Sequence, residues 1–318
     1  MKKIGKILCL IDPTSSQQPA MDKAAWLANE IGAEIELFAC LYGENDVGDK
    51  QIDSIGLKDV RKEISEPIRQ RLEEYALALR QRNLRVTVSL DWDRPLYAGI
   101  VRHAQACDAD VVFKDTHHHT ALNRALMTNT DWNLIRHCPI PLWLVRSTGV
   151  PQPGVIVASI DPMHHHDKPA ALDDRILLMG KSLANSIGAE LHAFHSYNPA
   201  DALADANANA YLPVSLPYDE IKKDMRAKHG ARFSEIVDFH KIPINRQHLM
   251  SGLASEELPI LAEKLGADLV IMGAVARSRW QHLFIGATAE RILEDLPCDL
   301  LIIKPDLFRT SVDNHQIK

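Results

Sequence analysis

The sequence predicts an α/β fold made of two tandem open-sheet domains, each with five mostly parallel strands. Three observations predict it. The chain has 318 residues, about the length of two ordinary domains. Its second half repeats motifs of its first half. Within each half, short Val, Ile and Leu runs alternate with longer amphipathic stretches, which is typical of parallel strands joined by crossover helices.

The repeat consists of four pairs of similar segments at spacings of 149 to 158 residues. The pairs are Leu8–Pro13 with Ala158–Pro162, Leu27–Glu34 with Leu183–Glu190, Asp108–Val112 with Gly266–Val270, and Cys138–Leu142 with Leu296–Leu300. A Pro/Gly-rich stretch between two apolar runs marks the boundary. We therefore divide the chain into a first copy (1–147), a linker (148–154), a second copy (155–306) and a C-terminal tail (307–318).

The elements follow from this alternation. Strands are expected in the first copy at 5–11, 34–41, 85–90, 109–114 and 141–146, and in the second copy at 155–160, 190–196, 244–249, 268–273 and 299–304. Helices are expected between them, with Gly32 and Gly188 as left-handed residues at two helix ends. A helix over 60–82 carries apolar residues at helical spacing, which indicates core packing. Segments 43–57 and 198–217 exceed this minimal fold and are expected to be long, lid-like loops.

Composition narrows the class of protein. With 46% hydrophobic and 25% charged residues the chain is globular. A net charge of −6 argues against direct nucleic-acid binding, which needs a basic face. Five cysteines without a CxxC pair indicate reduced thiols. The apolar run after Met1 is too short to cross a membrane, so we expect no membrane insertion and a cytoplasmic protein.

In such sheets the ligand crevice lies at the carboxyl ends of strands, so the loops after the first and fourth strands are the places to inspect. In the second copy, Gly273 ends the fourth strand, and a further glycine, separated from Ala276 by nine residues, opens a helix. Backbone N–H groups at such glycines can bind phosphate. The residues of this loop are Gly273, Val275, Ala276, Arg277, Gly286, Ala287 and Thr288. The alternative is that the two glycines are ordinary loop residues with no role in binding phosphate.

This loop resembles that of the universal stress protein family, which carries G-x-x-G, nine residues, then G-S/T, with an aspartate closing the first strand. Asp161 is that aspartate, whereas Ala276 and Ala287 depart from the pattern. The resemblance implies a Rossmann-like fold similar to the adenine nucleotide α-hydrolases. It also implies that ATP or another adenine nucleotide binds the second copy, with Asp161 at the adenosine and the loop around ribose and phosphates. A role in stress response, including protection during DNA damage, is implied in the same way.

The first copy keeps Asp12 but has lost the glycine loop, with Lys114 where the second copy has Gly273. Asp115, His117 and His119 alternate in the loop that follows, so in an extended backbone they project from one side. This spacing suits zinc, with a fourth ligand from water or a neighbour. The neighbours considered are His103, His137 and Cys138. The alternative is a solvated polar loop with no metal.

A second triplet, His164 to His166, follows Asp161 and admits phosphate contact, metal assistance or a plain polar loop. Neither triplet has the spacing of a metalloprotease, and no G-x-S-x-G nucleophile motif occurs.

The sequence therefore favours a stress-response protein that binds a small molecule and is not an enzyme, or at most hydrolyses ATP weakly. Two alternatives stay open: a metal-dependent or nucleotide hydrolase, and a carrier of a lipid-like or apolar ligand beneath the loop that contains Tyr211. The apolar fifth strands predict that the two copies pair as an intramolecular pseudo-dimer. A homodimer of whole chains is a further expectation.

Overall fold

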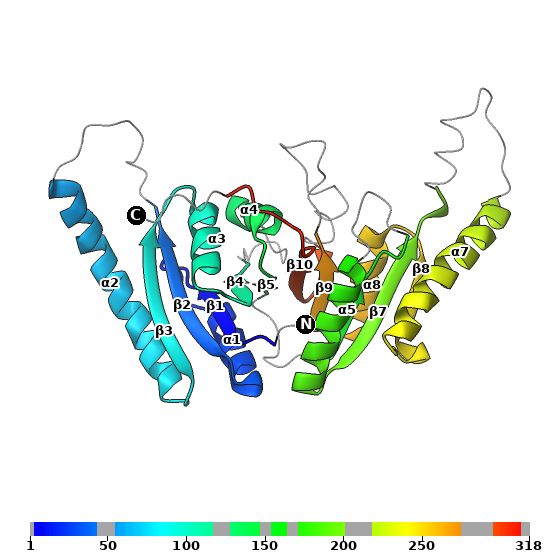
Figure 1. Ribbon diagram of the computed structural model, residues 1–318, viewed down its shortest axis with the longest axis horizontal. Helices are drawn as coiled ribbons and strands as arrows, with labels where there is room; N and C mark the ends of the chain where they lie inside the picture. The colour runs from blue at the N-terminus through cyan, green and yellow to red at the C-terminus, as the bar shows by residue number, and fades with distance from the viewer. Residues whose placement is uncertain are drawn as a thin grey trace, which may run out of the picture. The chain divides into compact units, whose positions relative to one another are not determined.

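The computed structural model describes most of the chain, and Figure 1 draws its helices and strands. The described residues are 3–42, 55–116, 128–146, 154–163, 171–200, 218–274 and 295–312, with side chains of 55–60 left undescribed. They form two compact units. One holds the first copy together with residues 309–312, and the other holds the described residues between 154 and 308.

The first copy forms a parallel sheet in the order β3-β2-β1-β4-β5. Its elements are β1 (Lys6–Leu10), α1 (Pro19–Ile31), β2 (Glu34–Leu41), α2 (Ile55–Arg80), β3 (Arg85–Trp92), α3 (Leu96–Ala106), β4 (Val111–Asp115), α4 (Asn129–His137) and β5 (Leu142–Val145). β1 is buried at every residue but its first, as expected of a central parallel strand. Phe113 stacks on Trp143 between β4 and β5, with ring centroids 4.8 Å apart.

The second copy repeats this topology, with parallel strands in the order β8-β7-β6-β9-β10. Its elements are β6 (Val155–Ser159), α5 (Ala171–Ile187), β7 (Glu190–Tyr197), α7 (Tyr218–Phe239), the short 3-10 turn η2 (Ile244–Arg246), β8 (Gln247–Ser251), α8 (Ala254–Leu265), β9 (Leu269–Gly273) and β10 (Asp299–Ile303). The strand order reverses between β1 and β4 in one copy and between β6 and β9 in the other. These are the switch points at which open α/β sheets place their ligands.

Two left-handed turns link helices to strands as expected. Gly32 has φ 72° after α1, and Gly188 has φ 69° after α5. A second pair of left-handed turns was not expected from the sequence. Asp108 has φ 54° in the first copy, and Gly266 has φ 58° at the equivalent position of the second copy. A left-handed aspartate is uncommon but tolerated, because its short side chain clashes little.

Two expected boundaries are wrong. Residues 244–246 form a turn rather than a strand, because Pro243 fixes the backbone and its carbonyl accepts a hydrogen bond from the N–H of Arg246. Helix α2 begins at Ile55, inside a segment expected to be loop. Residues 43–54 and 201–217, which carry most of the two expected lid-like loops, lie outside the described residues.

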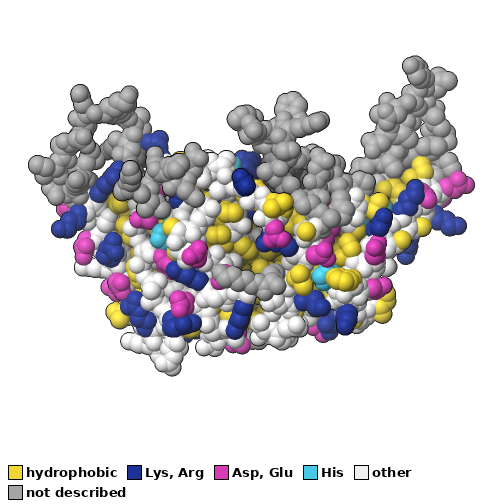
Figure 2. All heavy atoms as spheres, in the orientation of Figure 1, with side chains coloured by type: hydrophobic (Ala, Val, Ile, Leu, Met, Phe, Trp, Pro, Cys, Tyr) yellow, Lys and Arg dark blue, Asp and Glu magenta, His cyan; other side chains and the backbone are white. Residues whose placement is uncertain are grey.

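All five cysteines are free, as the sequence predicts: Cys9, Cys138 and Cys298 are buried, and Cys40 and Cys107 are half-buried. In the described part of the chain, no helix is both long and apolar enough to cross a membrane. On the face drawn in Figure 2, Lys and Arg side chains are interspersed with Asp and Glu.

Candidate functional site

In the second copy, the crevice begins at Asp161, two residues beyond β6. Its backbone N–H donates to a carboxylate oxygen of Asp173, 3.1 Å away, and Asp173 is buried in the first turn of α5. The strand pairing of β6 with β9 sets Ser159 beside Met272, directly before Gly273. Asp161 and Gly273 therefore end the two strands that flank the switch point, as the sequence predicts.

Gly273 has a packing role in addition to any role toward a ligand. A Cβ at this position would lie 2.7 Å from Cδ2 of Leu172 and 3.3 Å from Cδ1 of Ile176, both buried residues of α5. The absence of a side chain thus lets α5 approach the end of β9. The remaining residues of the expected cradle lie outside the described residues; they are Val275, Ala276, Arg277, Gly286, Ala287 and Thr288.

The first copy places Asp115, not Lys114, at the position of Gly273. Asp115 pairs with Val145 of β5 at the same register at which Gly273 pairs with Ile303 of β10. The expectation that Lys114 stands there is therefore wrong by one residue. Lys114 corresponds instead to Met272.

Asp115 sits against the first turn of α1. Its carboxylate accepts a hydrogen bond of 2.5 Å from the backbone N–H of Ala20. The pKa of Asp115 is raised to about 7, chiefly by burial and in smaller part by the nearby Asp12 and Asp22, whereas the Ala20 N–H and Lys114 lower it. A titratable group whose pKa is shifted in this way, and which lies at a ligand crevice, is a candidate for a functional role.

The ammonium group of Lys114 contacts two groups of the first copy. Its Nζ lies 2.6 Å from Oδ1 of Asp131, a residue with no exposed surface, and donates to the carbonyl of Asp115 at 2.9 Å. Asp131 also closes the capping box of α4, where the Thr128 N–H donates to its Oδ2 at 2.7 Å. The spacing of 158 residues that separates Asp108 from Gly266 and Cys138 from Leu296 also aligns Thr128 with Gly286. The first turns of α1 and α4, where a phosphate would be expected, thus already hold carboxylates of the protein.

Asp12 is likewise engaged locally. Its Oδ1 accepts hydrogen bonds from the N–H and hydroxyl of Thr14, at 2.8 and 2.6 Å. Gln18 spans the turn, accepting from the Asp12 N–H at 3.2 Å and donating to the Asp12 carbonyl at 2.7 Å. The Gln18 side chain thus accepts from the backbone N–H of Asp12, as Asp173 accepts from that of Asp161.

Of the expected zinc ligands, only Asp115 is among the described residues, since His117 and His119 lie outside them, as do His164 to His166. The three neighbours considered as a fourth ligand are engaged elsewhere. His103 lies between Glu36 and Asp91. His137 stacks on Tyr97 and lies 3.0 Å from the Ser311 hydroxyl, and Cys138 is buried at the end of α4.

Sequence reasoning missed three buried acidic groups, although a signal for each was present. Asp131 follows Thr128 by three residues, which is the spacing of a capping box. Glu36 stands between Ile35 and Leu37 in an otherwise apolar strand, and Asp173 lies in the first turn of an amphipathic helix.

Two parallel α/β units of one topology, each with its own switch point, define a tandem protein of the open-sheet α/β class. The model of the Universal stress protein family matches residues 3–146 and 167–304. The chain therefore belongs to the universal stress protein family, which confirms the resemblance and the fold class read from the sequence.

Several similar proteins align with this chain over nearly its whole length, and therefore over both of its copies. The chain is 29% identical over 325 residues to Universal stress protein E of Escherichia coli, covering 98% of each protein. It is 24% identical over 319 residues to Universal stress protein E of Photorhabdus laumondii, with the same coverage. Among solved structures, a universal stress protein from Archaeoglobus fulgidus aligns at TM-score 0.68 and 15% identity over 95% of this chain and 99% of that one. A protein of unknown function from Pseudomonas aeruginosa aligns at TM-score 0.64 and 24% identity over 95% and 93%.

Proposed function

We propose that this stress-response protein binds an adenine nucleotide, or a similar small anion, through its second copy. The observation that carries the proposal is the placement of Asp161 and Gly273 at the ends of β6 and β9, the strands that flank the switch point. Asp161 is half-buried, and its backbone is held by Asp173, so its carboxylate is presented from a fixed position. Val275 to Arg277 and Gly286 to Thr288 would complete the site.

The contrast between the copies supports this assignment. In the first copy, Asp115 replaces Gly273, and the N-terminal turns of α1 and α4 are satisfied by Asp115 and Asp131. The N–H groups of Ala20 and Thr128 at these turns already donate to carboxylates of the protein, which leaves them unavailable to a phosphate. We therefore assign the proposed nucleotide to the second copy. A protective role during stress such as DNA damage, in the cytoplasm, completes the proposal.

Native mass spectrometry of the purified full chain tests the ligand class directly. The expected result is a mass increment of one nucleotide per chain. A copurified lipid would favour the carrier alternative instead, and turnover of ATP at a rate that depends on added metal would favour the hydrolase.

A second candidate function is zinc binding by the first copy through Asp115, His117 and His119. The observation that favours it is the buried carboxyl of Asp115, whose negative charge is costly at this position until a cation neutralises it. Elemental analysis of protein purified without a histidine tag measures the zinc bound per chain, of which this site is expected to hold one. The double replacement His117→Ala with His119→Ala should remove it, and a metal content unchanged by that replacement would assign the triplet to a polar loop.

We also propose that the two copies pair within one chain as a pseudo-dimer. The apolar character of β5 and β10, Leu142–Val145 and Asp299–Ile303, supports this arrangement. Sedimentation equilibrium measures the mass of the protein in solution. A mass of two chains is expected if whole chains pair further into a homodimer.

A further inference from the structure

A cluster of metal-type donors lies on the face of the first sheet that α3 covers. Glu36 stands on β2, and His103 and Cys107 are four residues apart on the last turn of α3 and its cap. One donor atom from each lies within 4.8 Å of the other two. The cluster shares no residue with the crevice at the ends of β1 and β4.

We propose that Glu36, His103 and Cys107 form a zinc site, distinct from any ligand of the crevice. Zinc takes carboxylate, imidazole and thiolate ligands in a tetrahedral arrangement, with water in a remaining position. Oε1 of Glu36 and Nε2 of His103 face each other at 2.7 Å. Small side-chain rotations open this contact to the separation that two ligands of one ion need, so that the ion replaces the hydrogen bond between them.

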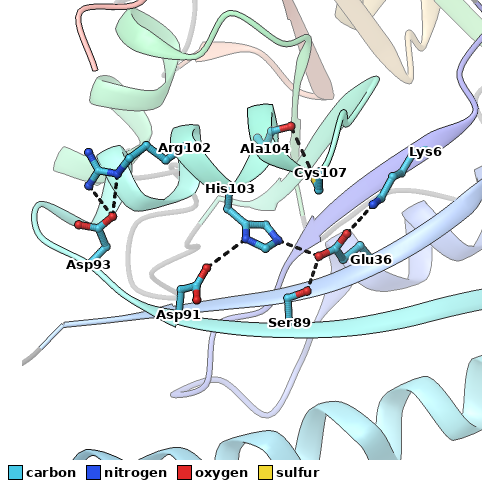
Figure 3. Close-up of polar contacts among 9 residues, drawn as sticks. All are labelled: Lys6, Glu36, Ser89, Asp91, Asp93, Arg102, His103, Ala104 and Cys107. Atoms are coloured by element: carbon cyan, nitrogen blue, oxygen red, sulfur yellow. Dashed lines mark hydrogen bonds and ion pairs between the residues drawn. The ribbon is translucent and has the colours of Figure 1, made fainter. Parts of the chain in front are cut away.

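The surroundings of His103 orient it as a metal ligand. Its Nδ1 lies 3.1 Å from Oδ2 of Asp91 on β3, and its ring stacks on Phe38 at 3.9 Å with 4° between the planes. Figure 3 shows the imidazole reaching from α3 between Asp91 and Glu36. A carboxylate on one ring nitrogen fixes the ring and leaves the other nitrogen for the metal. Asp91 is therefore a positioning residue.

The charges also suit a divalent ion. The carboxylate of Glu36 is buried and is contacted by Lys6 and the Ser89 hydroxyl in addition to His103, which favours its charged form. Lys6 Nζ contacts the second oxygen, Oε2, at 2.7 Å, whereas Oε1 accepts from the Ser89 hydroxyl and faces His103, so the ion would share Oε1 with Ser89. With a zinc-bound thiolate, the charges of Glu36, Asp91, Cys107, Lys6 and the ion sum to zero.

An ion-pair network alone would account for Glu36 and His103 but not for Cys107. The Cys107 Sγ contacts the Ala104 carbonyl at 3.6 Å and lies within 4.8 Å of the donor atoms of Glu36 and His103, which a pairing of those two residues alone does not explain. Metal coordination deprotonates such a thiol. The fold does not require polar residues at the two helix positions, since the repeat places Leu261 and Leu265 where the first copy has His103 and Cys107; the position of Glu36 is taken by His192.

Cobalt(II) titration of the metal-free full chain tests the proposal. A thiolate ligand to cobalt gives a charge-transfer absorption in the near ultraviolet, which a site made of Asp115, His117 and His119 cannot give. One equivalent of cobalt is expected to produce the band, and zinc is expected to displace it. Cys107→Ser should abolish the band, and Cys40→Ser, which changes the other half-buried thiol, should retain it.

Two further variants separate this site from the crevice. The His117→Ala and His119→Ala double variant should keep the cobalt band. Asp91→Asn should weaken zinc binding at the thiolate site by about 10- to 100-fold, as removal of such a partner typically does. Absence of the band in the wild-type chain, its persistence in Cys107→Ser, or its loss in Cys40→Ser would each overturn the proposal. Circular dichroism of every variant confirms that the comparison is made between folded proteins.

Discussion

The carboxylate of Asp115 accepts a hydrogen bond of 2.5 Å from the backbone N–H of Ala20, in the first turn of α1. This contact brings an acidic side chain of the first copy to the point where the second copy has Gly273. The two copies share their topology but not the charge of their crevices. This difference is the basis for proposing an anion site in the second copy and a cation site in the first.

Asp115→Asn is expected to stabilise the metal-free protein above neutral pH, because asparagine keeps an acceptor for Ala20 without a buried charge. The folded pKa of about 7 lies above the ordinary value of 3.8, so the folded state binds the proton more tightly. Stability of the wild type therefore falls as pH rises from about 4 to about 7, relative to the variant. The expected gain above pH 7 is about 1–2 kcal/mol, reduced from about 4 kcal/mol for the full pKa difference because the carboxyl is partly solvated. Urea unfolding with a chelator present, at pH 4 and pH 8, measures it; an equal effect at both values would contradict the prediction.

Lys114→Met should destabilise the first copy by about 3 kcal/mol, because it leaves the buried Asp131 without its cation. Methionine is the residue at the equivalent position of the second copy, Met272, so the fold accepts its shape. Adding Asp131→Asn should recover much of the loss, since the amide oxygen can still accept from Thr128. A double-mutant cycle by urea unfolding gives the coupling energy, and a value near zero would show that the 2.6 Å ion pair contributes little.

Gly273→Ala is expected to cost about 1–3 kcal/mol through overpacking against Leu172 and Ile176. Leu172→Val should reduce that cost, because it removes the atoms closest to the new methyl group. Gly154→Ala is the matched control: its Cβ would meet only Asp268, at an ordinary 3.6 Å. If Gly273→Ala were as harmless as Gly154→Ala in thermal unfolding, the packing role of Gly273 would be refuted.

Much of the fold could be predicted from the sequence because the repeat supplied each element twice. The parallel strands, the turns at Gly32 and Gly188, and the placement of Asp161 and Gly273 follow from local pattern and spacing. The turn after Pro243 could not be separated from β8, because an apolar pattern fixes a strand's face better than its first residue.

The candidate site was harder to predict because its chemistry depends on contacts between residues distant in the chain. Asp115 and Ala20 are 95 residues apart, and His103 and Glu36 are 67 apart. A one-residue error in alignment also exchanged the roles of Lys114 and Asp115, since successive strand residues point to opposite faces.

The pair formed by His192 and His248 should make the second copy sensitive to acid. Their ring nitrogens lie 2.9 Å apart. Burial lowers the pKa of both; Arg246 adds to this at His192, where Glu190 opposes it, and His192 and Lys264 add to it at His248. Because the folded pKa values lie below the ordinary 6.5, the unfolded state binds more protons, and stability is expected to fall as pH drops below about 6.5.

The matched variant combines His192→Gln with His248→Ser. Serine is the residue that the first copy has at the equivalent position, Ser89. It should lose less stability than the wild type between pH 7 and pH 5. Thermal unfolding across this range measures the difference. Parallel curves for the two proteins would show that the pair does not carry the acid sensitivity.

The central claim is that the second copy alone binds the nucleotide, and titration of the full chain with a fluorescent ATP analogue and magnesium tests it most directly. Wild type is expected to bind one nucleotide per chain. Asp161→Ala should weaken binding by about tenfold or more, as loss of a hydrogen bond to a charged group typically does, whereas Asp12→Ala, the equivalent change in the first copy, should leave affinity unchanged. No binding by the wild type, or a loss of affinity caused by Asp12→Ala and not by Asp161→Ala, would contradict the account.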